Sequence, residues 1–154
     1  MRVAGAPVGQ EITDLIAGRA PQTEERGSII VVIATDAPLL PHQLRRVAQR
    51  ASLALGRMGS YASNGSGDIF VAFSTANPRA AARTGLPRVE MLPNDVLGRL
   101  FLASVEATEE AIVNALVAAR TMTGVNGYTV HALPHDRLQA ALRKYGRLSK
   151  IGGQ

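Results

Sequence analysis

The fold of this chain is decided by the stretch Gly27-Ser28-Ile29-Ile30-Val31-Val32-Ile33-Ala34. Five β-branched residues stand in succession within it, and no polar residue interrupts the apolar run over 29–34. A run of this kind predicts a strand that is buried on both faces, in the interior of a layered fold. Gly27 and Ser28 therefore stand at the head of a buried strand.

The segments around this strand alternate between helical and strand patterns. Apolar residues at three- and four-residue steps predict helices over about 42–58 and 94–122, and a last helix begins near 134–136. A second apolar run predicts a strand over 69–74, and a short strand is expected over 128–131. This order predicts a mixed α/β (α+β) fold with helices layered on a sheet. Two buried strands cannot make a sheet with both faces covered, which indicates that the polypeptide is part of something larger.

The composition excludes several classes of protein. The chain has 154 residues, enough for about one domain, and its 46% hydrophobic and 19% charged residues exclude intrinsic disorder. No apolar run reaches the length of a membrane span and no apolar region follows Met1-Arg2, so neither a membrane segment nor a signal peptide is expected. The absence of cysteine excludes disulfides, a thiolate nucleophile and a Cys-ligated metal. The net charge of +5 comes from scattered basic residues and only 4% of residues are aromatic, so no nucleic-acid partner is expected.

The common catalytic and binding motifs are absent from the sequence. His42, His131 and His135 have neither HExxH spacing nor a cluster of carboxylates beside them, so no metal site is expected. No Walker A pattern and no Gly-x-Ser-x-Gly elbow occurs. The stretch Asn64-Gly65-Ser66-Gly67-Asp68 is rich in glycine but lacks the dinucleotide-binding fingerprint. By itself it is typical of a turn whose side chains bond to the backbone.

The Gly27–Ser28 junction carries the main chemical signal. A small residue followed by Ser, Thr or Cys at the head of a buried strand is typical of self-cleaving N-terminal nucleophile hydrolases. The Ser28 Oγ can attack the Gly27 carbonyl, and hydrolysis of the resulting ester leaves Ser28 as a new N-terminus. Its free α-amine, with an ordinary pKa of about 7.7–8.0, is then a general base beside its own hydroxyl. Gly27 suits the cut because a residue without a Cβ tolerates strained geometry.

Several longer motifs support the same interpretation. They are the run from Gly27 to Leu44, the glycine-rich turn Asn64–Asp68, the stretch Ala72-Phe73-Ser74-Thr75-Ala76-Asn77 and the segment Thr129-Val130-His131-Ala132-Leu133-Pro134-His135-Asp136. Together they resemble the DmpA-type family of L-aminopeptidase/D-esterases and β-peptidyl aminopeptidases, over essentially everything from Gly27 to about Tyr145. The resemblance implies part of an αββα four-layer sandwich of the DmpA/ornithine-acetyltransferase-like type. In that family a precursor cuts itself into a larger α and a smaller β polypeptide.

The resemblance also implies site residues. Ser28 would be the nucleophile and the first residue of the β polypeptide, with cleavage between Gly27 and Ser28. The second serine and the acidic residue of the family fall on Ser66 and Asp68. Ser66 would hydrogen-bond the Ser28 amine or hydroxyl and relay a proton, while Asp68 would orient Ser66 and favour the protonated amine. Well-studied members carry Glu where this chain has the shorter Asp68.

The chain departs from the family in length, because only 27 residues precede Ser28. We expect residues 1–27 to be the loop-rich tail of the α portion, and 28–154 to be the β-subunit-like portion of a single αββα domain. The resemblance places the oxyanion-hole groups in the part outside this chain, so no residue is assigned to that role. We expect the chain alone to be inactive, to self-associate through its sheet and to stay mostly uncut at Gly27–Ser28.

The functional prediction is a fragment of a self-processing serine aminopeptidase that hydrolyses N-terminal residues of short peptides, amides or esters. Two alternatives stay open: an ornithine-acetyltransferase-like acyl transferase, against which Ser28 argues because the usual nucleophile there is Thr, and an inactive interaction or structural fragment. The mechanism implies no cofactor. The expected partners are an α-type polypeptide that completes the fold and further copies in a homo-oligomer of αβ units. The cytoplasm is the favoured compartment, with the periplasm as the alternative.

Overall fold

The computed structural model describes residues 1–15 and 27–148, which fall into two compact units. Within the described residues, the sheet unit comprises 27–54 and 62–108. The terminal unit comprises the described residues 1–15, 55–61 and 109–148. The expected division into 1–27 and 28–154 stays a prediction, since residues 16–26, which lead up to the boundary, lie outside the described residues.

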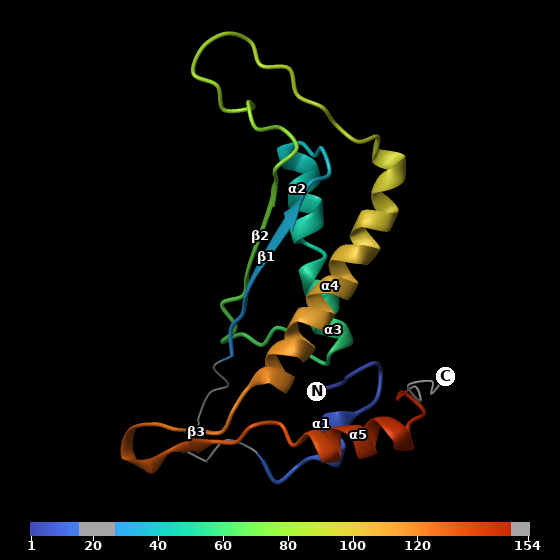
Figure 1. Ribbon diagram of the computed structural model, residues 1–154, viewed down its shortest axis with the longest axis vertical. Helices are drawn as coiled ribbons and strands as arrows, with labels where there is room; N and C mark the ends of the chain where they lie inside the picture. Colours follow the sequence, from blue (N-terminus) through green and yellow to red (C-terminus); the bar gives the residue numbers. More distant parts are fainter. Residues whose placement is uncertain (16–26, 149–154) are drawn as a thin grey trace, which may run out of the picture. The chain divides into compact units, whose positions relative to one another are not determined.

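Two parallel strands form the sheet of the sheet unit (Figure 1). β1 (Ile30–Thr35) pairs with β2 (Ile69–Ser74), in register from Ile30↔Ile69 to Thr35↔Ser74. The helix α2 (Pro41–Ala48) follows β1 and contacts both strands. Parallel neighbours need such a crossover connection, because the chain must return to the same end of the sheet. The two apolar runs thus form the predicted strands, the first displaced by one residue.

The core of the sheet unit lies on one face of this sheet. Leu39, Val47 and Leu97 are buried at its centre, and Ile33 and Ala72 of the two strands pack against them. Leu97 begins the long helix α4 (Leu97–Ala118), which follows the short 3-10 helix η1 (Asn94–Val96). Every second residue of each strand is half-buried, as expected where one face of a strand packs and the other does not.

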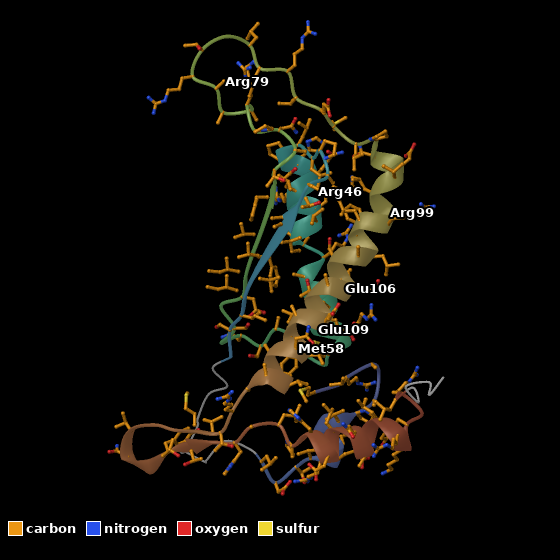
Figure 2. The ribbon with its side chains drawn as sticks, viewed as in Figure 1. Arg46, Met58, Arg79, Arg99, Glu106 and Glu109 are labelled. Atoms are coloured by element: carbon orange, nitrogen blue, oxygen red, sulfur yellow. The ribbon has the colours of Figure 1, made fainter. Side chains whose placement is uncertain are left out.

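The opposite face of the sheet is uncovered in the part of the chain that the structure describes. Its members, called here the open sheet face, are large and apolar: Ile30 (69% exposed), Val32 (60%), Ile69 (54%), Val71 (45%) and Phe73 (45%). Figure 2 shows side chains standing off the two strands on the side away from α2. The prediction that the first strand is buried on both faces is therefore wrong for this chain. The reason is that the described helices of the sheet unit cover one face only.

The predicted helix over 42–58 is two helices. α2 ends at Ala48 and α3 (Ala51–Arg57) follows, because the Arg50 N–H donates to the carbonyl oxygen of Val47 (2.9 Å) and tightens the chain into a turn. The Arg50 guanidinium lies 4.1 Å from the centre of the Phe101 ring, and that of Arg46 lies 5.0 Å from it. These cations over an aromatic face fix the turn against α4.

The terminal unit is built around α5 (His135–Lys144), which begins where the sequence predicts it. The N-terminal residues and the short helix α1 (Val8–Glu11) pack on this helix. β3 (Met122–Thr123) and β4 (Thr129–Val130) form an antiparallel pair around the 3-10 turn η2 (Val125–Gly127). The predicted helix over 94–122 is thus too long at its end, because Met122 bonds to β4 instead of continuing α4. None of the described helices is long and apolar enough to cross a membrane.

Candidate active site

The candidate site lies where the two strands begin. Ser28 precedes Ile30 by two residues, and Gly67 precedes Ile69 by two residues, while Ile30 and Ile69 are partners in the parallel pair. Parallel strands enter the sheet from the same edge, so the segments before them run side by side. The Ile69 N–H continues this pairing one step outward by donating to the carbonyl oxygen of Ile29 (2.9 Å).

Three side-chain hydrogen bonds order the site, one within the glycine-rich turn and two between the two segments. The Ser66 hydroxyl donates to Asp68 Oδ1 (2.7 Å), and the Ile29 N–H donates to the same oxygen (3.1 Å). The Gly67 N–H donates to Ser28 Oγ (2.9 Å). The structure therefore brings Ser28, Ser66 and Asp68 into one hydrogen-bonded group through two backbone amides.

Asp68 spans this arrangement although its side chain is one methylene shorter than that of the Glu that the resemblance implies. Its Oδ1 is 2.7 Å from the Ser66 hydroxyl oxygen, within the range for an O–H donor on a charged acceptor. The bond to the Ile29 N–H also holds the residue next to Ser28 against β2. The Asp68 carboxylate thus fixes both the Ser66 hydroxyl and Ile29, the residue that follows Ser28.

Two hydrogen bonds orient Ser66 within the glycine-rich turn. Its N–H donates to the carbonyl oxygen of Ser63 (2.8 Å), which closes the glycine-rich stretch, and its hydroxyl proton is directed at Asp68. The lone pairs of the hydroxyl oxygen are then the part of Ser66 available to a further donor. The expected bond from Ser66 to the Ser28 amine stays a prediction, because the free amine exists only after the Gly27–Ser28 bond is cut.

Gly67 is a site residue that the sequence analysis missed. A Cβ at this position would lie in ordinary contact with Ser28 Oγ (3.4 Å), so Gly67 contributes its backbone N–H to the site rather than the absence of a side chain. A donor on an oxygen stabilises the negative charge that the oxygen acquires when it loses its proton. Spacing in the sequence does not single out Gly67, because Ser28 directly precedes the apolar run over 29–34 whereas Gly67 stands two residues before the run over 69–74. The two residues are aligned by the pairing of Ile30 with Ile69.

The backbone at Gly27 does not show the strained geometry that was expected there. The residue is exposed, its φ is not positive, and a Cβ added there would meet no described atom within 4 Å. The described residues therefore give no steric reason for glycine before Ser28. The expectation that Gly27 relieves strain at the cut gains no support from this geometry.

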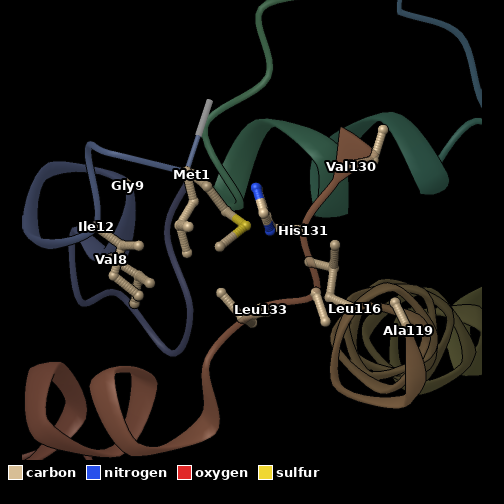
Figure 3. A pocket seen from close by; sticks show the side chains of 11 residues that line it. Met1, Val8, Gly9, Ile12, Leu116, Ala119, Val130, His131 and Leu133 are labelled. Carbon is tan, nitrogen blue, oxygen red and sulfur yellow. The ribbon is translucent and has the colours of Figure 1, made fainter. Parts of the chain in front are cut away.

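A separate pocket of about 350 Å³ lies in the terminal unit (Figure 3). Its lining is mostly apolar and comes from the N-terminal residues, the end of α4 and the segment after β3: Met1, Val8, Ile12, Leu116, Val130, His131 and Leu133. His135 does not line this pocket, and its Nε2 atom is hydrogen-bonded to the carbonyl oxygen of Val117 (2.9 Å). Within residues 1–15 and 27–148, no group of three or more side chains is placed to hold a metal ion.

Comparison with solved structures identifies the class of fold. The chain superposes on the L-aminopeptidase D-Ala-esterase/amidase of Ochrobactrum anthropi with a TM-score of 0.84 and 47% sequence identity, over 97% of this chain and 40% of that one. That enzyme is described as a prototype for the serine aminopeptidases and a new variant of the N-terminal nucleophile hydrolase fold. A Burkholderia β-aminopeptidase matches with a TM-score of 0.79, 46% identity, and 97% and 41% of the two chains. The predicted fold class is confirmed: this chain has an N-terminal nucleophile hydrolase fold of mixed helices and strands.

The family follows from the sequence of the same segments. The chain belongs to peptidase family S58, whose sequence pattern matches residues 1–130. It is 56% identical to the β-peptidyl aminopeptidase BapA of Sphingosinicella microcystinivorans, over 97% of this chain and 41% of that enzyme. It is 42% identical to the BapA of Sphingosinicella xenopeptidilytica, over 93% and 38% of the two chains. The resemblance to the aminopeptidase family is confirmed, and the chain spans about two fifths of the length of these relatives.

Proposed function

We propose that this chain is part of a self-processing serine aminopeptidase that removes N-terminal residues from short peptides, amides or esters. The observation that carries the proposal is the bond from the Gly67 N–H to Ser28 Oγ (2.9 Å), beside the Ser66–Asp68 pair at the same edge of the sheet. A hydroxyl at the head of a strand with a fixed backbone donor on its oxygen is placed for nucleophilic attack. The family of the chain and its named relatives support the same activity.

The cut is the first chemical step. Ser28 Oγ attacks the Gly27 carbonyl carbon, and the Gly27–Ser28 C–N bond breaks as the nitrogen takes the hydroxyl proton. Water then hydrolyses the ester between the two residues, which leaves a carboxylate on Gly27 and a free α-amine on Ser28. Asp68 holds the Ile29 N–H during this step, so the strand stays in register while the bond before it opens.

Turnover uses the new amine as the base. It takes the Ser28 Oγ proton as Oγ attacks the substrate carbonyl, and returns the proton to the leaving amine as the acyl-enzyme ester forms. Ser66 contacts the amine through its free lone pairs, while the negative charge of Asp68 favours the protonated amine. Water attacks the ester in the same way and releases the product. No cofactor enters these steps.

The proposed partner is an α-type polypeptide that supplies the rest of the fold and of the substrate pocket. Two observations support it: the relatives continue for about three fifths of their length beyond the matched part, and the open sheet face is apolar and uncovered. Exposed apolar patches of this kind commonly mark interaction surfaces. We extend the proposal to a homo-oligomer of αβ units and to a cytoplasmic location, with the chain alone inactive.

The test removes the nucleophile in an enzyme that contains this chain and the rest of the protein. Ser28→Ala should abolish hydrolysis of an amino-acid p-nitroanilide, whereas Ser52→Ala, a change at an exposed serine of α3, should leave it unaltered. A second version supplies the upstream polypeptide, ending at Gly27, and residues 28–154 as separate polypeptides, so that loss of hydrolysis is distinguished from loss of cutting. Full activity of Ser28→Ala in the second version would overturn the assignment.

A further inference from the structure

Two arginines of the sheet unit share one aromatic ring. The guanidinium carbon of Arg50 lies 4.1 Å from the centre of the Phe101 ring of α4, and that of Arg46 lies 5.0 Å from the same point. Arg46 belongs to α2, and Arg50 follows it by four residues in the turn after that helix. Figure 2 shows Arg46 between α2 and α4. Two positive charges are therefore held next to a single ring.

Neither guanidinium has an acidic partner among the described residues. The ion pairs in the part of the chain that the structure describes use other basic residues, namely Arg57, Arg137 and Lys144. Like charges four residues apart repel each other, and the face of an aromatic ring offsets this repulsion without neutralising the charge. Both arginines are half-buried, so their charges are less screened by salt than that of the exposed Arg45.

A buried side chain positions Arg46 through a short chain of hydrogen bonds. Gln43 is 0% exposed, and its Nε2 donates to the carbonyl oxygen of Leu92 (2.8 Å) and to Asn94 Oδ1 (3.1 Å). The same Asn94 oxygen accepts from Arg46 Nη1 (3.3 Å). A guanidinium has five N–H donors, so this bond leaves most of those of Arg46 available. No described residue accepts a hydrogen bond from the guanidinium of Arg50.

The ligand that this pair fits is an oxyanion with two negative charges. The planar guanidinium binds phosphate through two parallel N–H···O bonds, which an ammonium group cannot do. A phosphate group is mostly doubly charged above its second pKa of about 6. Two guanidiniums balance that charge, whereas a carboxylate carries only one. The Phe101 ring and Asn94 hold the two cations in place before binding, which lowers the entropy cost of ordering them.

We infer that Arg46 and Arg50 form a binding site for phosphate, either as the free ion or as a phosphate monoester. The site is built by α2, the turn that follows it and α4. The candidate active site lies instead where β1 and β2 begin, so the inference does not rest on the proposed aminopeptidase activity. The ligand contributes the negative charge that the described residues do not supply to this pair.

The experiment titrates inorganic phosphate into the enzyme that contains this chain and the rest of the protein. Isothermal titration calorimetry at neutral pH and constant ionic strength should show saturable binding. Arg46→Gln and Arg50→Gln should each raise the Kd about tenfold, the loss expected for charge-assisted hydrogen bonds. Phosphate should raise the Tm of the parent enzyme but not that of the double variant, whose fold is checked by circular dichroism. Glycerol 3-phosphate separates the two sources, because tighter binding than inorganic phosphate assigns a monoester and equal or weaker binding assigns the free ion.

A matched control removes the same charge from the same helix. Arg45 precedes Arg46 on α2 and is exposed, so Arg45→Gln should leave the Kd unaltered. Arg50→Lys keeps the charge but loses the planar fork, and should weaken binding as Arg50→Gln does. Equal weakening by Arg45→Gln would overturn the inference, because net charge alone would then explain binding. So would saturable binding of poly-glutamate without binding of phosphate. Neither result touches the proposed activity, which is tested through Ser28.

Discussion

Replacing Val32 by lysine places one positive charge in the middle of the open sheet face. Val32 is 60% exposed and stands opposite Val71 in the parallel pair, while the other face of its strand stays packed. The side chain therefore has room for the longer lysine. We expect the free energy of unfolding to fall by less than about 1 kcal/mol, the span of strand propensities.

The larger cost falls on whatever covers this face. Fully burying a valine side chain is worth roughly 1.5–3 kcal/mol, so burying the 60% that is exposed contributes about 1–2 kcal/mol. Lysine loses that gain and adds the cost of taking an ammonium group out of water. A combined loss of about 2 kcal/mol or more weakens association roughly 30-fold or more.

Sedimentation velocity over a concentration series measures this association, first for the chain alone and then with the rest of the protein supplied. Leu86→Lys is the matched control, because Leu86 is 97% exposed in the long loop after β2 and receives the same charge. Val32→Lys should abolish self-association and weaken binding of the partner, whereas Leu86→Lys should do neither. If the two variants behave alike, the open sheet face is not an interface and the reasoning fails.

Three further changes test the site and the terminal unit. Gly67→Ala keeps the N–H donor and places a Cβ in ordinary contact with Ser28 Oγ (3.4 Å), so kcat should fall far less than the about 10²–10³ that losing a donor typically costs, with the fold retained as judged by circular dichroism. Asp68→Asn should lower kcat more than it raises KM, because the carboxylate acts on charge that develops during attack. Hydrogen bonds lower the pKa of Glu11 (from Tyr145 and Lys144) and of Asp14 (from Arg137), so their contribution to stability is complete above their ordinary pKa values and is lost as the pH falls through the folded ones. The Tm of the parent chain should therefore drop more below about pH 4 than that of a Glu11→Gln, Asp14→Asn variant.

Local sequence patterns predicted the two strands well, because a run of apolar and β-branched residues favours a strand over only a few residues. The apolar runs became β1 and β2, and the last helix begins at His135 as expected. The Arg50 side chain at the helix break contacts the Phe101 ring, and Met122 pairs with β4, so both places involve partners outside the local apolar pattern. Apolar periodicity continues through both places, so it cannot reveal either of them.

The residues of the candidate site likewise differ in whether the sequence alone could identify them. Ser28 could be named from its place at the head of an apolar strand, and Ser66 and Asp68 from the resemblance to the aminopeptidase family. Gly67 contributes a backbone N–H, which every residue except proline has, so its role appears only once the register of the two strands is known. Burial of both strand faces was predicted from an apolar run, which does not show what covers the strand, and the described chain covers one face.

The state of the Gly27–Ser28 bond shows whether the isolated chain can cleave itself. The Ser28 hydroxyl and its Gly67 N–H donor are held in place within the described residues by the Asp68 bond to the Ile29 N–H and by the register of the two strands. The oxyanion that forms on the Gly27 carbonyl needs donors of its own, and losing one typically costs about 10²–10³ in rate. We expect the isolated chain to stay mostly uncut, with Gly27 joined to Ser28 by intact-mass spectrometry, and the cut to appear when the rest of the protein is supplied. A species beginning at Ser28 that forms without a partner, and is lost in Ser28→Ala, would show that this chain holds its own oxyanion site.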